Sequence, residues 1–142
     1  MPSDDLAAVV KRWFAKAQND LRAIALVLPD PDCPYDVVCF HAQQAAEKYL
    51  KGLLAFHGVC FPKTHDLEEL AALVPAGAAF DVTREHLFAL SQLAVVPRYP
   101  DFDEEVDRDR AQGALRMAQQ VKASVLESLA RQGLDLTKEI HS

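Results

Sequence analysis

A row of nitrogen-bearing side chains lies along one face of the helix predicted for residues 35–57. Its members are His41, Gln44, Lys48 and Lys51, which span about 80° of arc at about 100° per residue. They present an imidazole, an amide and two ammonium groups, all of which can hold phosphate oxygens. The row is therefore a candidate anion-binding site.

The same row also has a purely structural interpretation. An amphipathic helix needs a solvent side, where lysine and glutamine are common, and Gln43 and Glu47 are expected on that side too. Local charge favours binding, because residues 41–65 hold three lysines against one glutamate, a net charge of +2. The opposite face is predicted to be buried through Ala42, Ala45, Ala46, Tyr49, Leu50, Leu53 and Phe56. Both interpretations stay open.

His65 follows Lys63 and Thr64 directly before a short predicted helix. The helix dipole and the free backbone donors favour an anion at that end. His65 therefore either joins the phosphate-binding row or only packs the start of the helix.

Arg98 and Tyr99 lie between Pro97 and Pro100 on a predicted exposed corner. The planar guanidinium of Arg98 suits a phosphate through paired, charge-assisted hydrogen bonds. Its alternative role is pairing with the acidic residues just downstream.

Other catalytic and metal-binding chemistries are disfavoured. Cys39, His41, His57 and Cys60 resemble two ligand pairs, but the two histidines stand about 24 Å apart along one helix, too far for one zinc ion. We predict no metal and no cofactor, and we expect Cys39 and Cys60 in the core. The five glycines are too dispersed for a phosphate loop. The acids of residues 101–110 are interpreted as helix-capping and surface-pairing groups.

The elements that position these residues are five predicted helices. They run from Asp4 or Asp5 to about residue 28, from 35 to about 57, from Asp66 to about 74, from about 83 to 96, and from about 101 onward. Gly58 is expected to end the second helix in a left-handed conformation. No segment alternates apolar and polar residues with the period of two that is typical of a strand. The pattern therefore predicts an all-α, up-and-down bundle over residues 1–133, with a frayed tail over residues 134–142.

Composition limits the class of function. The 142 residues fit one domain, and a net charge of -6 makes long-range attraction to nucleic acid weak, so any contact needs a local patch. Three cysteines without CxxC spacing, and a start without the features of a secretion signal, predict a cytoplasmic protein with reduced thiols. No uninterrupted apolar run is long enough for a membrane span.

Three segments together resemble the HEPN domain family. They are CFHAQQAAEKYLKGLLAFHG over residues 39–58, KTHDLEEL over 63–70 and RYPD over 98–101. The resemblance covers roughly residues 8–128 and implies a bundle of about five helices, commonly a homodimer, that binds nucleotides or RNA. It also implies a small nucleotidyltransferase as partner, in a toxin–antitoxin module.

Many HEPN proteins are metal-independent ribonucleases, with a motif of an arginine followed by four to six residues and a histidine. In this sequence Arg98 corresponds to the arginine of the motif. However, Asp103, Glu104 and Glu105 stand at the positions where the motif requires a histidine. A carboxylate there would repel RNA phosphate and is a poor substitute for imidazole near neutral pH. The chain resembles the family's fold more than its nuclease signature.

We therefore predict a nucleotide- or RNA-binding partner of a nucleotidyltransferase. The predicted ligand-binding residues are His41, Gln44, Lys48, Lys51, His65 and Arg98. The alternatives are a degenerate HEPN ribonuclease that uses Arg98 and Tyr99, and a non-catalytic protein-interaction module.

Overall fold

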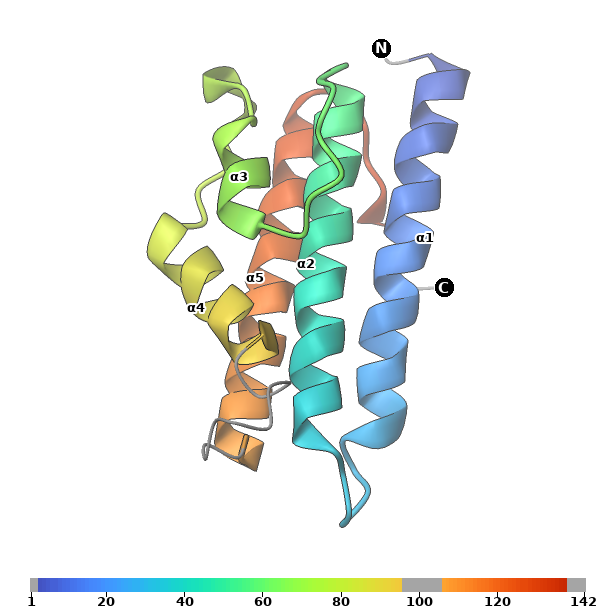
Figure 1. The fold of residues 1–142 in the computed structure, drawn as a ribbon. Helices are drawn as coiled ribbons and strands as arrows, with labels where there is room; N and C mark the ends of the chain where they lie inside the picture. Colours follow the sequence, from blue (N-terminus) through green and yellow to red (C-terminus); the bar gives the residue numbers. More distant parts are fainter. Residues whose placement is uncertain (1–2, 96–105, 138–142) are drawn as a thin grey trace.

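Three long helices form the body of the molecule. The computed structural model describes residues 3–95 and 106–137, and in it α1 (Asp4–Val27), α2 (Tyr35–Phe56) and α5 (Arg108–Arg131) lie side by side. Figure 1 shows α2 and α5 running in the same direction, with α1 antiparallel to both. Helix α2 packs against both α1 and α5, so it is the central helix of the fold.

Shorter elements cover one side of the central helix. Helix α3 (Leu67–Ala72), the 3-10 turn η1 (Ala76–Ala78) and α4 (Arg84–Val95) follow α2, and both helices pack on it (Figure 1). The described residues contain these five α-helices and no strand. The predicted all-α class and five-helix bundle are confirmed.

Local side-chain hydrogen bonds explain where the helices begin, and two of the predicted starts are corrected. The Ser3 side chain, rather than Asp4 or Asp5, caps α1 by accepting a hydrogen bond from the Leu6 backbone N–H at 3.1 Å. Helix α5 begins after Asp107, whose carboxylate accepts from the Arg110 N–H at 2.8 Å. The predicted start near residue 101 lies outside the described part of the chain, but the described residues 106 and 107 precede the helix rather than belonging to it.

Other predicted ends are confirmed. Asp66 caps α3 by accepting from the backbone N–H groups of Glu68 and Glu69. Gly58 adopts a φ of 68° just after α2, and the Val59 N–H then donates back to Leu54 at 3.0 Å. A residue without a Cβ adopts this left-handed conformation without strain. The turn fixes where the chain leaves α2 and so where residues 59–65 cross its face.

The core is built from the predicted apolar faces, but three polar or thiol residues differ from expectation. Gln43 and Glu47 are buried rather than on a solvent side, because the segment before α3 lies on that part of α2 and His65 contacts both residues. Cys39 is buried as expected, whereas Cys60 is exposed on the segment after α2. A helical wheel describes one helix alone, so it could not predict that another segment covers this part of α2.

The packed core extends past the last helix. Leu134 and Leu136 are buried against the bundle, although the sequence predicts a frayed tail over residues 134–142. Residues 138–142 lie outside the described structure. Within the described residues, none of the helices combines the length and the hydropathy that a membrane span requires.

Candidate functional site

The first half of the candidate site joins α1 to α2 through a buried carboxylate. Asp20 on α1 accepts from Lys48 Nζ at 2.6 Å and lies 2.8 Å from Nδ1 of His41, both on α2. Asp20 is only 7% exposed, whereas the His41 and Lys48 side chains are 29% and 23% exposed. A carboxylate beneath the surface therefore holds two basic groups that still reach solvent.

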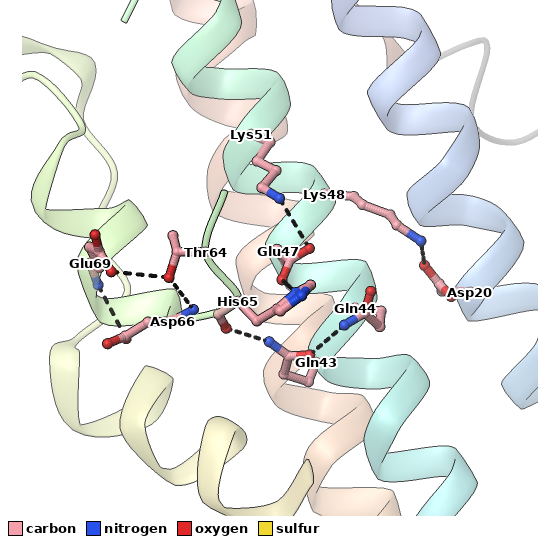
Figure 2. Close-up of polar contacts among 10 residues, drawn as sticks. All are labelled: Asp20, Gln43, Gln44, Glu47, Lys48, Lys51, Thr64, His65, Asp66 and Glu69. Carbon is pink, nitrogen blue, oxygen red and sulfur yellow. Dashed lines mark hydrogen bonds and ion pairs between the residues drawn. The ribbon is translucent and has the colours of Figure 1, made fainter. Parts of the chain in front are cut away.

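The second half joins α2 to the segment before α3 (Figure 2). Glu47 on α2 lies 2.7 Å from Nδ1 of His65 and accepts from Lys51 Nζ at 3.3 Å. The Glu47 side chain is 4% exposed, whereas that of His65 is 80% exposed. The second carboxylate thus repeats the arrangement of the first, with one lysine and one histidine.

Amide groups fix the backbone of the second half. Gln43 Nε2 donates to the backbone carbonyl of His65 at 2.8 Å, and Gln44 Nε2 donates to Gln43 Oε1 at 2.9 Å. These two bonds hold residue 65 against α2 while its imidazole faces Glu47 (Figure 2). The buried Gln43 amide is satisfied in this way, as buried polar groups require.

We call the cluster of Asp20, His41, Gln43, Gln44, Glu47, Lys48, Lys51 and His65 the paired-carboxylate face. Its two carboxylates balance its two lysines, so any excess positive charge depends on the histidines. The net charge of +2 counted along residues 41–65 did not include Asp20, because that residue comes from another helix. Burying such charges is tolerable only because each carboxylate has two close partners.

Core residues behind this face are neutral. Burial first, and the Asp20 carboxylate second, raise the pKa of the Tyr49 phenol. The Tyr49 ring packs edge-on against Phe14 of α1, with ring centroids 5.0 Å apart. Burial, with a smaller contribution from Asp36, raises the pKa of the Cys39 thiol to about 11. Tyr49 and Cys39 therefore serve packing at neutral pH.

The structure brings together most of the predicted ligand-binding residues. His41, Gln44, Lys48, Lys51 and His65 all belong to the paired-carboxylate face. Arg98 and Tyr99 lie outside the described residues, so their relation to this face stays a prediction.

Sequence reasoning missed the carboxylates that organise the site. Asp20 stands on the buried face of α1, three residues after Ala17 and four before Ile24. A charged residue at an apolar position of a helix is a signal that a partner faces it. Glu47 carried no such signal, because the helical wheel placed it among polar neighbours.

Comparison with known proteins agrees with this fold. The model of the HEPN domain matches residues 10–129. A crystal structure of TT1696 from Thermus thermophilus is similar, with a TM-score of 0.71 and 31% sequence identity, and the match covers 84% of this chain and 97% of that chain. No curated protein matches the chain significantly. Since the family model spans most of the sequence and a solved structure agrees in fold, this chain belongs to the HEPN domain family.

Proposed function

We propose that this HEPN domain protein binds a phosphate-bearing ligand, a nucleotide or RNA, on its paired-carboxylate face. The observation that carries the proposal is that two buried carboxylates anchor His41, Lys48 and His65, whose side chains remain partly exposed, together with Lys51, whose side chain is 11% exposed. Anchoring reduces the conformational entropy that these side chains lose when a ligand binds. The face is therefore organised for an anion before the anion arrives.

The hydrogen-bonding capacity left on these groups suits a nucleotide. Lys48 uses one ammonium hydrogen on Asp20, which leaves two donors for phosphate oxygens. His41 and His65 direct Nδ1 at a carboxylate, so Nε2 is the nitrogen left for a ligand. Nε2 donates to phosphate when the ring is charged and accepts from a ribose hydroxyl when it is neutral.

Binding is tested by isothermal titration with ATP and with a short single-stranded RNA. Lys48→Met and Lys51→Met each remove one ammonium group while leaving the carboxylate its histidine partner. We expect the double variant to bind about tenfold more weakly or worse, since charge-assisted bonds are worth about 1.5–3 kcal/mol each. Arg131→Gln is the matched control, because it removes an exposed cation that pairs with Glu127 on α5.

Two results would contradict this proposal. One is that neither ligand binds, and the other is that the double variant binds as the wild type does. Metal-independent cleavage of labelled RNA in EDTA, abolished by Arg98→Ala, would instead support the ribonuclease alternative.

Family membership supports the second half of the proposal, that the chain acts as a homodimer and as partner of a small nucleotidyltransferase in a toxin–antitoxin module. The cysteine pattern, three residues without CxxC spacing, supports a cytoplasmic location. Light scattering after gel filtration should give about twice the chain mass of 15.7 kDa. A nucleotidyltransferase encoded beside this protein should co-purify with it when the two are co-expressed. If the protein is a monomer and no such enzyme co-purifies with it, the proposed dimer and partner are wrong, whereas the proposed ligand binding is unaffected.

A further inference from the structure

A second surface lies beside the paired-carboxylate face, along the edge of α1 where Trp13 meets α2. A cavity of about 280 Å³ is lined there by Val9, Arg12, Trp13 and Lys16. These residues stand three and four apart, so they share one face of the helix, on which Arg12 and Lys16 are exposed whereas Val9 and Trp13 are half-buried. The cavity is slightly smaller than typical drug-sized pockets, which start at about 300 Å³. Its size suits one planar ring rather than a whole large ligand.

Aromatic rings and lysines meet at Trp13, which lines this cavity. The Trp13 ring packs edge-on against Phe61, with centroids 6.0 Å apart, and Lys51 Nζ lies 5.7 Å and 5.8 Å from the centroids of these two rings. Lys16 Nζ lies 5.9 Å from the Trp13 ring. Lys51 also contacts Glu47, so it belongs to both surfaces and joins them.

The basic groups on α1 differ from those on the paired-carboxylate face. Lys48 and Lys51 each have a carboxylate partner, whereas within residues 3–95 and 106–137 neither Arg12 nor Lys16 forms an ion pair. Arg12 and Lys16 are also exposed. Their charges are therefore not offset by a bonded acid, and they form a locally positive edge on a chain whose net charge is -6.

From this geometry we infer that Trp13 is a stacking platform for a nucleobase, with Arg12 and Lys16 holding the adjoining phosphate. An aromatic ring beside unpaired cations is the arrangement that binds single-stranded nucleic acid and nucleotides without sequence preference. Lys16 lies near the ring on a flexible stem, so it can move to the phosphate when a base stacks. This inference rests on the proposed function and names where the base goes.

Lys51 lies between the two surfaces, so one ligand can contact both of them. A phosphate held by Lys48 and Lys51 on α2 places the attached base toward Trp13 on α1, because Lys51 touches the Trp13 ring as well as Glu47. The base and the phosphate held by Arg12 and Lys16 would then contact α1, and the phosphate held by Lys48 and Lys51 would contact α2. A nucleotide and an RNA strand share this chemistry, and the experiment separates them.

The chain has one tryptophan, so its fluorescence reports directly on the platform. We expect AMP or a short single-stranded RNA to quench the emission, because a stacked base contacts the indole ring. Inorganic triphosphate carries the charge without a base and should not quench. Quenching by AMP identifies a mononucleotide ligand, and quenching by RNA alone identifies a strand.

Three variants test the residues by titration of fluorescently labelled RNA. Trp13→Leu should weaken binding about tenfold, since stacking on an aromatic side chain is worth about 1–3 kcal/mol per base. Arg12→Gln should weaken binding without affecting thermal unfolding, because the side chain is exposed, and it keeps the test informative if Trp13→Leu fails to fold. Arg22→Gln is the control, as a cation of α1 that does not line the cavity.

Failure of the platform is distinguishable from failure of the proposed function. If ligands bind and Lys48→Met weakens them, while Trp13→Leu and Arg12→Gln have no effect and no quenching occurs, the platform is wrong and the proposed function stands. Equal quenching by inorganic triphosphate also overturns the platform. Complete lack of binding by ATP, AMP and RNA overturns both.

Discussion

Asp20 occupies a position of α1 that its neighbours Ala17 and Ile24 mark as apolar. Its burial is tolerated because Lys48 and His41 lie 2.6 Å and 2.8 Å from its oxygens. Without these partners a buried carboxylate would be strongly destabilising. At the level of single residues, the site is thus a pair of carboxylates whose partners are also the ligand-binding groups.

Replacing Asp20 with asparagine tests this role. Asp20→Asn should lower the free energy of unfolding by about 1–3 kcal/mol, because Lys48 and His41 lose the charged carboxylate to which they are bonded. Urea denaturation measures the change. Glu127→Gln breaks an exposed pair at 2.6 Å and should cost no more than about 1 kcal/mol. Equal losses of unfolding free energy from the two substitutions would contradict the conclusion that the buried Asp20 contributes more to stability than an exposed ion pair does.

The thiols should differ in reactivity. Cys60 is exposed, whereas Cys33 and Cys39 are buried, and burial raises the pKa of both buried thiols. We therefore expect iodoacetamide to modify Cys60 first in the native protein, as found by mass spectrometry of peptides. All three cysteines should react in denaturant. Early modification of Cys39 would show that the core opens near the start of α2.

Cys39 also predicts how stability depends on pH. Its pKa is about 11 in the folded protein against a reference value of 9.0, so the unfolded chain releases the proton first. This contribution is fully present below pH 9.0 and is lost as the pH rises through about 11. Urea denaturation across that range should show a shallower decline for Cys39→Ala than for the wild type. Identical declines would contradict the assignment to Cys39.

Among the helices, the contact between α1 and α2 sets the position of both candidate surfaces. A Cβ added to Gly52 on α2 would lie 2.8 Å from Phe14 Cε1 and 3.3 Å from Trp13 Cβ. Real side chains do not approach this closely without displacement. The glycine therefore allows α1 to approach α2, which brings Asp20 to Lys48 and Trp13 to Lys51.

Gly52→Ala should destabilise the protein despite the better helix propensity of alanine. We expect a loss of about 1–3 kcal/mol from overpacking, measured by urea denaturation. Gly113→Ala on α5 is the matched control, since its nearest neighbour, Arg116 Nη2, lies 3.8 Å from the added Cβ. That substitution should stabilise by about 0.5–1 kcal/mol. If both substitutions stabilise, the helices are not held this closely.

For the whole molecule, charge determines how a ligand can be attracted. The net charge of -6 opposes a polyanion at a distance, while Arg12 and Lys16, which form no ion pair among the described residues, attract it locally. Lys48 and Lys51 each lie beside a carboxylate, so they add phosphate contacts rather than long-range attraction. Four phosphate contacts to a single strand predict a slope of about -3 for log K against log salt. RNA titrations at several salt concentrations measure this slope. A slope near zero would contradict phosphate contacts on both surfaces.

The sequence by itself determined the helices, the end of α2 at Gly58, the cap at Asp66 and the row from His41 to Lys51. Each of these depends on residues close together in the chain, whose relative positions follow from helix geometry. It did not determine that Asp20 pairs with Lys48, that residues 59–65 bury Glu47, or that Trp13 meets Lys51. Those contacts join separate elements, and periodicity states which residues share a face but not what lies opposite it. Only the packing of α1 and of the segment before α3 against α2 decided them.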